Sequence, residues 1–118
     1  MDWKPISLEG LQTLINRELV ACSDELRTFF ADAAFPPAKW RQSPWDDDGG
    51  GFWAVATHSD LVLWYNDIED GFNVSRFAQW GEIPFDEYWC NHDPLQYALP
   101  KLAGGPGMSC GPPQPLSK

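Results

Sequence analysis

The sequence predicts an α+β domain in which two helices precede an antiparallel sheet. Before Pro36-Pro37, apolar residues recur at intervals of three and four, the spacing of a helix with one buried face. After the two prolines, short runs of β-branched and aromatic residues alternate with polar, glycine-containing turns. Runs of helix followed by runs of strand are typical of an α+β fold. A chain of 118 residues has the size of one domain.

The two helices are expected at Leu8–Ala21 and Asp24–Ala34. Ser7 and Ser23 precede them, and serine side chains accept hydrogen bonds from the free N–H groups of a first helical turn. The two segments are expected to pack as an αα-hairpin or to form one bent helix. Pro36-Pro37 ends the second helix, because proline lacks an N–H and disfavours helical geometry in the residue before it.

The sheet is expected to contain four to five short strands. The expected strands are, in order, Ala38–Gln42, Phe52–His58, Leu61–Tyr65, Phe72–Ser75 and Ile83–Tyr88. The first is an edge strand, and Ser59-Asp60 is the tight turn of a hairpin. The segments Ser43–Gly51 and Asn66–Gly71 are expected to be a loop and a turn.

A short C-terminal helix is expected to complete the domain. Asp93 has the side chain of an N-cap and Pro94 suits the first helical position. Pro100 is expected to end this helix early. Because residues 104–118 are rich in proline and glycine, we expect a flexible tail there and a single domain over residues 1–103.

Negative charge is concentrated in the sheet half of the chain. The net charge is −9, and the segment between Pro44 and Asp93 alone carries −10, from eleven acidic residues and Arg76. Six of the seven Trp lie in or beside that segment. Phosphate repels such a surface, which argues against nucleic acid or an anionic membrane as a partner and favours a basic protein.

The sequence indicates a cytoplasmic protein. Cys22, Cys90 and Cys110 are too few and too scattered for the disulfide framework of a secreted domain. No stretch approaches the ~20 apolar residues that span a bilayer, and the N-terminus lacks the pattern of a signal peptide. We expect three free thiols.

Known catalytic and metal-binding motifs are absent from the sequence. Neither Asp46–Gly49 nor Asn66–Gly71 fits a calcium-binding EF-hand, because apolar residues fall where ligands are needed. The two histidines and scattered cysteines lack the spacing of a zinc site. The chain has no nucleophile elbow, P-loop, dinucleotide fingerprint or metalloprotease motif. We expect no catalytic residue, no cofactor and no metal.

Leu63–Asn73 (LWYNDIEDGFN) is the strongest candidate for a binding rim. A strand of large hydrophobic residues runs directly into acids and amides, which either hydrogen-bond the turn or meet a cationic partner. At an interface, aromatic side chains supply contact energy and carboxylates steer the encounter. The candidate partner-binding residues are Trp45, Asp46, Asp47, Asp48, Asp67, Glu69, Asp70, Glu82, Asp86 and Glu87.

An alternative from another class is a small enzyme or ligand-binding domain with a site formed by Tyr65–Glu69 and Cys90–His92. Cys90 and His92 are the residue types of a nucleophile and its base. This hypothesis requires the two segments to meet at one concave pocket. A scaffold or assembly subunit is a third hypothesis.

The chain resembles a family of small, functionally uncharacterised bacterial proteins. The shared pattern, V-L-W-Y-N-D-I-E-x-G-F-N, then G-x-I, then Y-W-C-N-x-D-x-L-Q, corresponds here to Leu63–Asn73, Gly81–Ile83 and Tyr88–Gln96. The resemblance covers about residues 52–97 and implies a bacterial, cytoplasmic α+β domain, without catalytic residues to carry over. Asp46–Gly51 and the tail look like additions to that pattern.

In size, acidity and helix-then-sheet order, the chain is also similar to the immunity proteins that neutralise bacterial toxins. The leading hypothesis is therefore a non-catalytic acidic protein, an immunity-like or antitoxin-like inhibitor of a basic partner.

Overall fold

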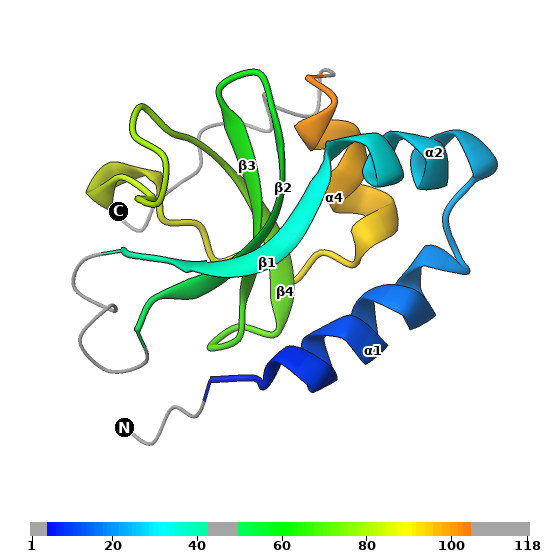
Figure 1. The fold of residues 1–118 in the computed structure, drawn as a ribbon, viewed down its shortest axis with the longest axis horizontal. Coiled ribbons are helices and arrows are strands. Elements are labelled where there is room, and N and C mark those ends of the chain that lie inside the picture. Colours follow the sequence, from blue (N-terminus) through cyan, green and yellow to red (C-terminus); the bar gives the residue numbers. More distant parts are fainter. Residues whose placement is uncertain (1–4, 43–49, 105–118) are drawn as a thin grey trace.

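The computed structural model describes residues 5–42 and 50–104. The elements follow in the order α1 (Leu8–Leu19), α2 (Asp24–Ala33), β1 (Ala34–Trp40), β2 (Phe52–His58), β3 (Leu61–Asn66), β4 (Gly71–Arg76), the 3₁₀ helix η1 (Phe85–Glu87) and α4 (Leu95–Leu102) (Figure 1). The predicted α+β fold is confirmed. Trp45, Asp46, Asp47 and Asp48 lie outside the described residues, as do residues 105–118 of the expected tail.

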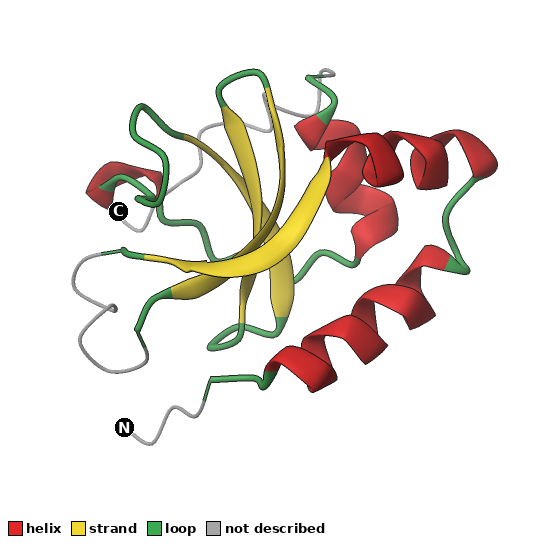
Figure 2. Cartoon of the chain, viewed as in Figure 1, coloured by secondary structure: helices red, strands yellow, loops and turns green. Residues whose placement is uncertain are grey.

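The four strands form one antiparallel sheet in the order β1-β2-β3-β4. The three α-helices lie to one side of the strands, and residues 77–92, including η1, lie to the other (Figure 2). Side chains of a strand alternate between faces, and Leu63 accordingly packs with the helices while Trp64 packs with Ile83 and Tyr88. Every residue of β3 is buried, because both faces and both edges of this strand are covered.

The helical layer begins with two capped helices. Ser7 Oγ accepts a hydrogen bond from Gly10 N at 3.0 Å, and Ser23 Oγ accepts one from Leu26 N at 3.1 Å. These caps define two separate helices, and the expectations of one bent helix and of an αα-hairpin are both wrong, because α1 and α2 pack mainly on α4 instead of on each other. Helix α4 contacts both of them and also strands β3 and β4, so it joins the helical layer to the sheet. No helix within the described residues is long and apolar enough to cross a membrane.

The first strand starts earlier than predicted, at Ala34 instead of Ala38, and contains both prolines. Proline is tolerated there because β1 is an edge strand, whose outward N–H positions need no partner within the sheet. The register with β2 shifts between Ala34 and Ala38, at the two prolines. The second helix does end before the two prolines, as predicted, but β1 begins at the very next residue, with no loop between them.

The predicted fifth strand, Ile83–Tyr88, is wrong. Backbone bonds between Arg41 and the 81–83 segment form only a single parallel bridge, after which the chain turns into η1. Ile83 and Tyr88 are buried because the whole segment packs across the sheet, so their burial does not reflect strand geometry.

Two expectations for the last helix are also wrong. Asp93 is not its N-cap: its carboxylate accepts a hydrogen bond from Lys101 Nζ at 2.7 Å, and Pro94 holds the cap position. Pro100 does not end the helix, which continues to Leu102. Leu99 and Leu102 are fully buried on either side of the proline, and this burial holds the last turn in place.

Candidate functional site

The β3–β4 turn, the predicted binding rim, is organised around Asn66. Its Oδ1 accepts hydrogen bonds from the backbone N–H groups of Ile68 and Glu69, at 3.0 and 3.2 Å. Its Nδ2 donates to Tyr88 Oη and to the backbone oxygen of Trp89, both at 3.0 Å. Asn66 is completely buried and therefore shapes the turn and ties it to the later segment.

A second buried amide, Asn73, binds the same later segment. Its Oδ1 accepts a hydrogen bond from Asn91 N at 2.9 Å, and its Nδ2 donates to Asn91 O at 3.3 Å. The side chain thus pairs with a backbone amide as a neighbouring strand would. Beside it, Gly71 approaches the backbone of Asn91 and His92 so closely that a Cβ atom would stand 2.3 Å from His92 Cα.

The acids of the turn largely support the fold. Asp67 Oδ2 accepts a hydrogen bond from Ile6 N at 2.7 Å. Glu69 lies beside His92: its backbone oxygen accepts a hydrogen bond from Nδ1 at 2.6 Å, and its carboxylate lies 3.7 Å from Nε2. Asp70 is exposed and has a positive φ of 60°.

The two segments of the alternative site, Tyr65–Glu69 and Cys90–His92, do lie side by side. Asn66, Asp67, Glu69 and His92, however, use their polar side chains to bond to backbone, to Tyr88 or to one another. Burial raises the pKa of the Cys90 thiol, and the Glu69 carboxylate raises it further. The thiol is therefore protonated near neutral pH, the opposite of an activated nucleophile. Within the described residues, no group of three or more His, Cys, Asp or Glu side chains is placed to hold a metal ion.

The remaining described acids, Glu82, Asp86 and Glu87, belong to the segment of residues 77–92, which lies on the other side of the sheet from the helices. Glu87 Oε1 accepts a hydrogen bond from the backbone N–H of Arg76, the last residue of β4, at 2.8 Å. Asp70 directly precedes the first residue of β4. The length of this strand, roughly 20 Å for six residues, separates the turn from Glu87. Glu82 lies beside Arg41, at the end of β1, the opposite edge strand of the sheet. The described candidates therefore do not form one rim.

The segment of residues 80–86 also contains two exposed aromatic side chains that the sequence reasoning missed. Trp80 is 61% exposed and Phe85 is 74% exposed, whereas Trp40, Phe52 and Trp64 are fully buried. We call Trp80, Glu82, Phe85 and Asp86 the acidic–aromatic ridge. The available sequence signals were the Trp80-Gly81 pair, typical of a turn, and Pro84 directly before Phe85.

Backbone hydrogen bonds hold the ridge in place. Residues 79–82 form a turn that is closed by a hydrogen bond from Glu82 N to Gln79 O, at 3.2 Å. Gly81, within this turn, has a φ of 96°. The backbone N–H of Arg41 donates a hydrogen bond to Gly81 O, and the carbonyl oxygen of Arg41 accepts one from Ile83 N, both at 2.9 Å. These two bonds attach the turn to the end of β1. Gln42 Nε2 donates to Pro84 O at 3.2 Å, directly before η1. The exposed side chains thus stand on a fixed backbone.

Trp80 is also held by other rings. Its centroid lies 5.0 Å from that of Trp40, 5.1 Å from that of Phe35 and 6.2 Å from that of Phe77. The three interplanar angles are 62°, 52° and 79°, so these rings meet it edge-on or tilted. Three rings therefore hold the indole in place while Trp80 stays 61% exposed.

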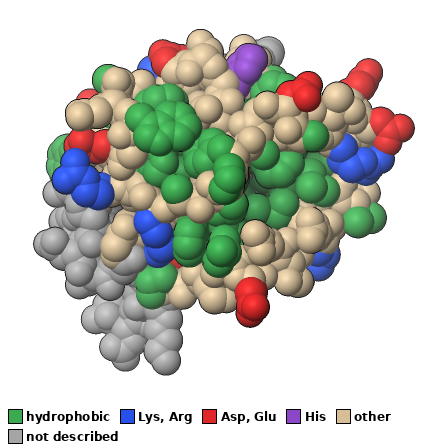
Figure 3. All heavy atoms as spheres, in the orientation of Figure 1, with side chains coloured by type: hydrophobic (Ala, Val, Ile, Leu, Met, Phe, Trp, Pro, Cys, Tyr) green, Lys and Arg blue, Asp and Glu red, His purple; other side chains and the backbone are tan. Residues whose placement is uncertain are grey.

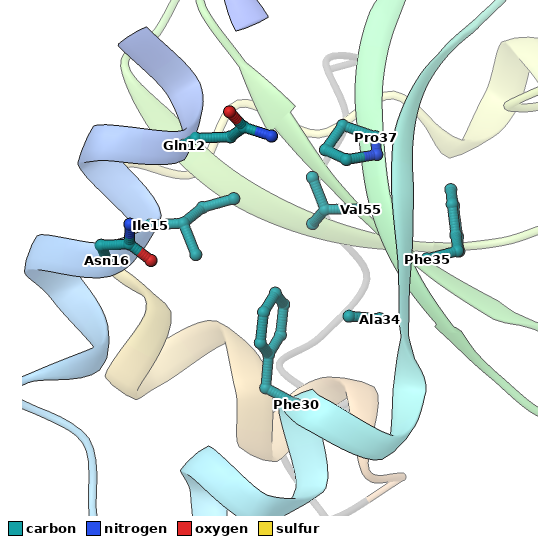
Figure 4. A pocket seen from close by; sticks show the side chains of 8 residues that line it. All are labelled: Gln12, Ile15, Asn16, Phe30, Ala34, Phe35, Pro37 and Val55. Carbon is teal, nitrogen blue, oxygen red and sulfur yellow. The ribbon is translucent and has the colours of Figure 1, made fainter. Parts of the chain in front are cut away.

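A shallow groove of about 290 Å³ lies between α1, the end of α2 and β1 (Figure 4). It is lined by Gln12, Ile15, Asn16, Phe30, Ala34, Phe35, Pro37 and Val55. In the space-filling view, hydrophobic side chains surround a hollow on this face of the molecule (Figure 3). The side chain of Phe35 points to the other side of β1 (Figure 4), where it contacts Trp80, so the groove and Trp80 lie on opposite sides of this strand.

Comparisons of the chain with protein-family models, curated proteins and solved structures found no match.

Proposed function

We propose that this protein is a non-catalytic binding protein that uses the acidic–aromatic ridge to engage a basic protein, in the manner of an immunity protein or antitoxin. The observation that carries the proposal is the exposure of Trp80 and Phe85 in the same short segment of the chain as Glu82 and Asp86. The resemblance to immunity proteins in size, acidity and element order agrees with it.

The physical reasoning follows the anatomy of protein interfaces. A buried aromatic anchor contributes a large share of binding energy, and the hydrophobic area of a phenylalanine or tryptophan is among the largest available. Carboxylates around such anchors raise the rate of encounter with a basic partner and disfavour acidic competitors. A ridge held by backbone hydrogen bonds loses little conformational entropy on binding, which favours affinity.

The proposal is tested by capture from a lysate of the native cells with a matched pair of variants. The ridge variant carries Phe85→Ala and Asp86→Asn. The control is Tyr97→Ala, which removes a side chain 59% exposed on α4, in the helical layer on the other face of the sheet. We expect the ridge variant to weaken capture of a basic protein about tenfold or more, and the control to leave it unchanged.

Salt dependence supplies the second arm of the test. Binding steered by carboxylates weakens as ionic strength rises, because salt screens exposed charges over about 10 Å at 0.1 M. Two results contradict the proposal: the parent and the ridge variant capture the same proteins equally, or the captured complex is indifferent to salt.

A further inference from the structure

We infer that the partner group recognised at the 79–82 turn is an arginine side chain, which stacks on Trp80 and pairs with Glu82. This inference rests on the proposed function and specifies its chemistry. Trp80 offers an aromatic surface that is 61% exposed and fixed by Trp40, Phe35 and Phe77. Glu82 lies two residues further along the same turn, with its side chain 45% exposed.

The turn already meets one guanidinium. Arg41 Nη2 lies 3.4 Å from Glu82 Oε1, a single long contact between two exposed side chains. Such a contact contributes little, because both groups remain hydrated and side-chain entropy opposes it. A carboxylate accepts several hydrogen bonds through its two oxygens, so Glu82 retains capacity for a second donor.

Arginine fits this surface better than lysine for geometric reasons. Its guanidinium is planar, stacks on an aromatic ring and can donate two parallel hydrogen bonds to one carboxylate. An ammonium group is a compact, strongly hydrated charge that offers no planar face. The negative charge of the chain favours either cation, whereas an exposed Trp80 and the Glu82 carboxylate in the same turn favour arginine.

Arg41 is then an internal competitor. Its guanidinium occupies one oxygen of the carboxylate that the arginine of the partner would use, and its positive charge repels that arginine. The substitution Arg41→Gln leaves the backbone bonds of residue 41 to the 81–83 segment in place while it removes the competing charge. This variant should bind an arginine ligand more tightly than the parent.

The probes are an acetylated oligoarginine amide and an oligolysine amide of the same length, titrated into the protein at low ionic strength. Fluorine NMR of protein containing fluorotryptophan reports on each indole, and Trp80→Phe assigns the Trp80 resonance. We expect the oligoarginine to shift that resonance and to bind about fivefold tighter than the oligolysine. Glu82→Gln should weaken oligoarginine binding about fivefold, and Arg41→Gln should strengthen it about threefold.

Glu9→Gln is the matched control, since it removes the same charge from an exposed residue in the first turn of α1. Equal affinity for the two peptides, an unshifted Trp80 resonance, or equal effects of Glu82→Gln and Glu9→Gln would overturn the inference. The proposed function fails by a different result, equal capture of native proteins by the parent and the Phe85→Ala/Asp86→Asn variant, so the two failures are distinguishable.

Discussion

Glu18 on α1 caps helix α4, although it lies 77 residues before the helix start: its Oε1 accepts a hydrogen bond from Leu95 N at 2.8 Å. The segment before α4 supplies no such bond, because Pro94 has no capping side chain and the Asp93 carboxylate binds Lys101. A free backbone N–H at a helix start is thus satisfied by another helix. This contact joins the N-terminal helical pair to the C-terminal helix.

Glu18→Ala should destabilise the protein by removing this long-range cap. We expect the free energy of unfolding to fall by about 1 kcal/mol, the usual effect of losing an N-terminal cap. Glu18→Gln keeps a side-chain oxygen of the same reach and should retain most of the stability. Urea denaturation of the parent and both variants measures the difference; equal losses for Ala and Gln would show that the hydrogen bond is not the cause.

Asn73→Ala should destabilise the protein by about 1–3 kcal/mol, because it leaves the backbone amide groups of Asn91 without their partner. The matched control is Asn91→Ala. Asn91 is exposed and contributes its backbone atoms to this pair, so its side chain should be dispensable. Denaturation midpoints that shift equally for the two variants would contradict the assigned pairing.

Gly71→Ala should lower the free energy of unfolding by about 3 kcal/mol, the upper end of the usual range for overpacking. The new Cβ would stand 2.4 Å from Asn91 O as well as 2.3 Å from His92 Cα, and neither backbone atom belongs to a flexible side chain. Gly104→Ala is a useful comparison. There a Cβ meets nothing within 4 Å, and only the φ of 86° is unfavourable, so about 1 kcal/mol is expected. Thermal unfolding of both variants tests the ranking.

Stability should fall steeply above pH 10. Burial raises the pKa of Tyr65 to about 12, and the carboxylates of Asp70, Asp67 and Glu18 contribute. Burial likewise raises the pKa of Tyr88 to about 12. Below the unfolded-state pKa near 10, both phenols are neutral in the folded and the unfolded chain, and their contribution to stability is complete. As the pH rises from 10 toward 12, the unfolded chain releases these protons first, and the contribution is lost.

Urea denaturation at a series of alkaline pH values measures this loss. The Tyr65→Phe variant has one titrating phenol fewer and should show a shallower decline than the parent. A decline of the same slope in both proteins would mean that Tyr65 does not contribute.

The helices, their serine caps and the β2–β3 hairpin are predictable from sequence because each depends on local interactions. Ser7 and Ser23 accept bonds from residues three positions further on, and Ser59, with a φ of 57°, turns the chain between two strands that alternate in pattern. Residues 77–93 have no such local logic. Asn66 and Asn73 bond to them from 23 and 18 residues away, and Glu18 bonds to Leu95, just after them, from 77 residues away.

The candidate site divides in the same way. Sequence alone determined that the acidic residues gather in the sheet half and that no known catalytic motif is present, because charge and motif spacing are properties of the chain itself. Only the tertiary structure decided that the described acids do not form one rim, that the turn acids mainly support the fold, and that Trp80 and Phe85 reach solvent. Exposure depends on what packs over a side chain, and in this protein those neighbours come from distant parts of the sequence.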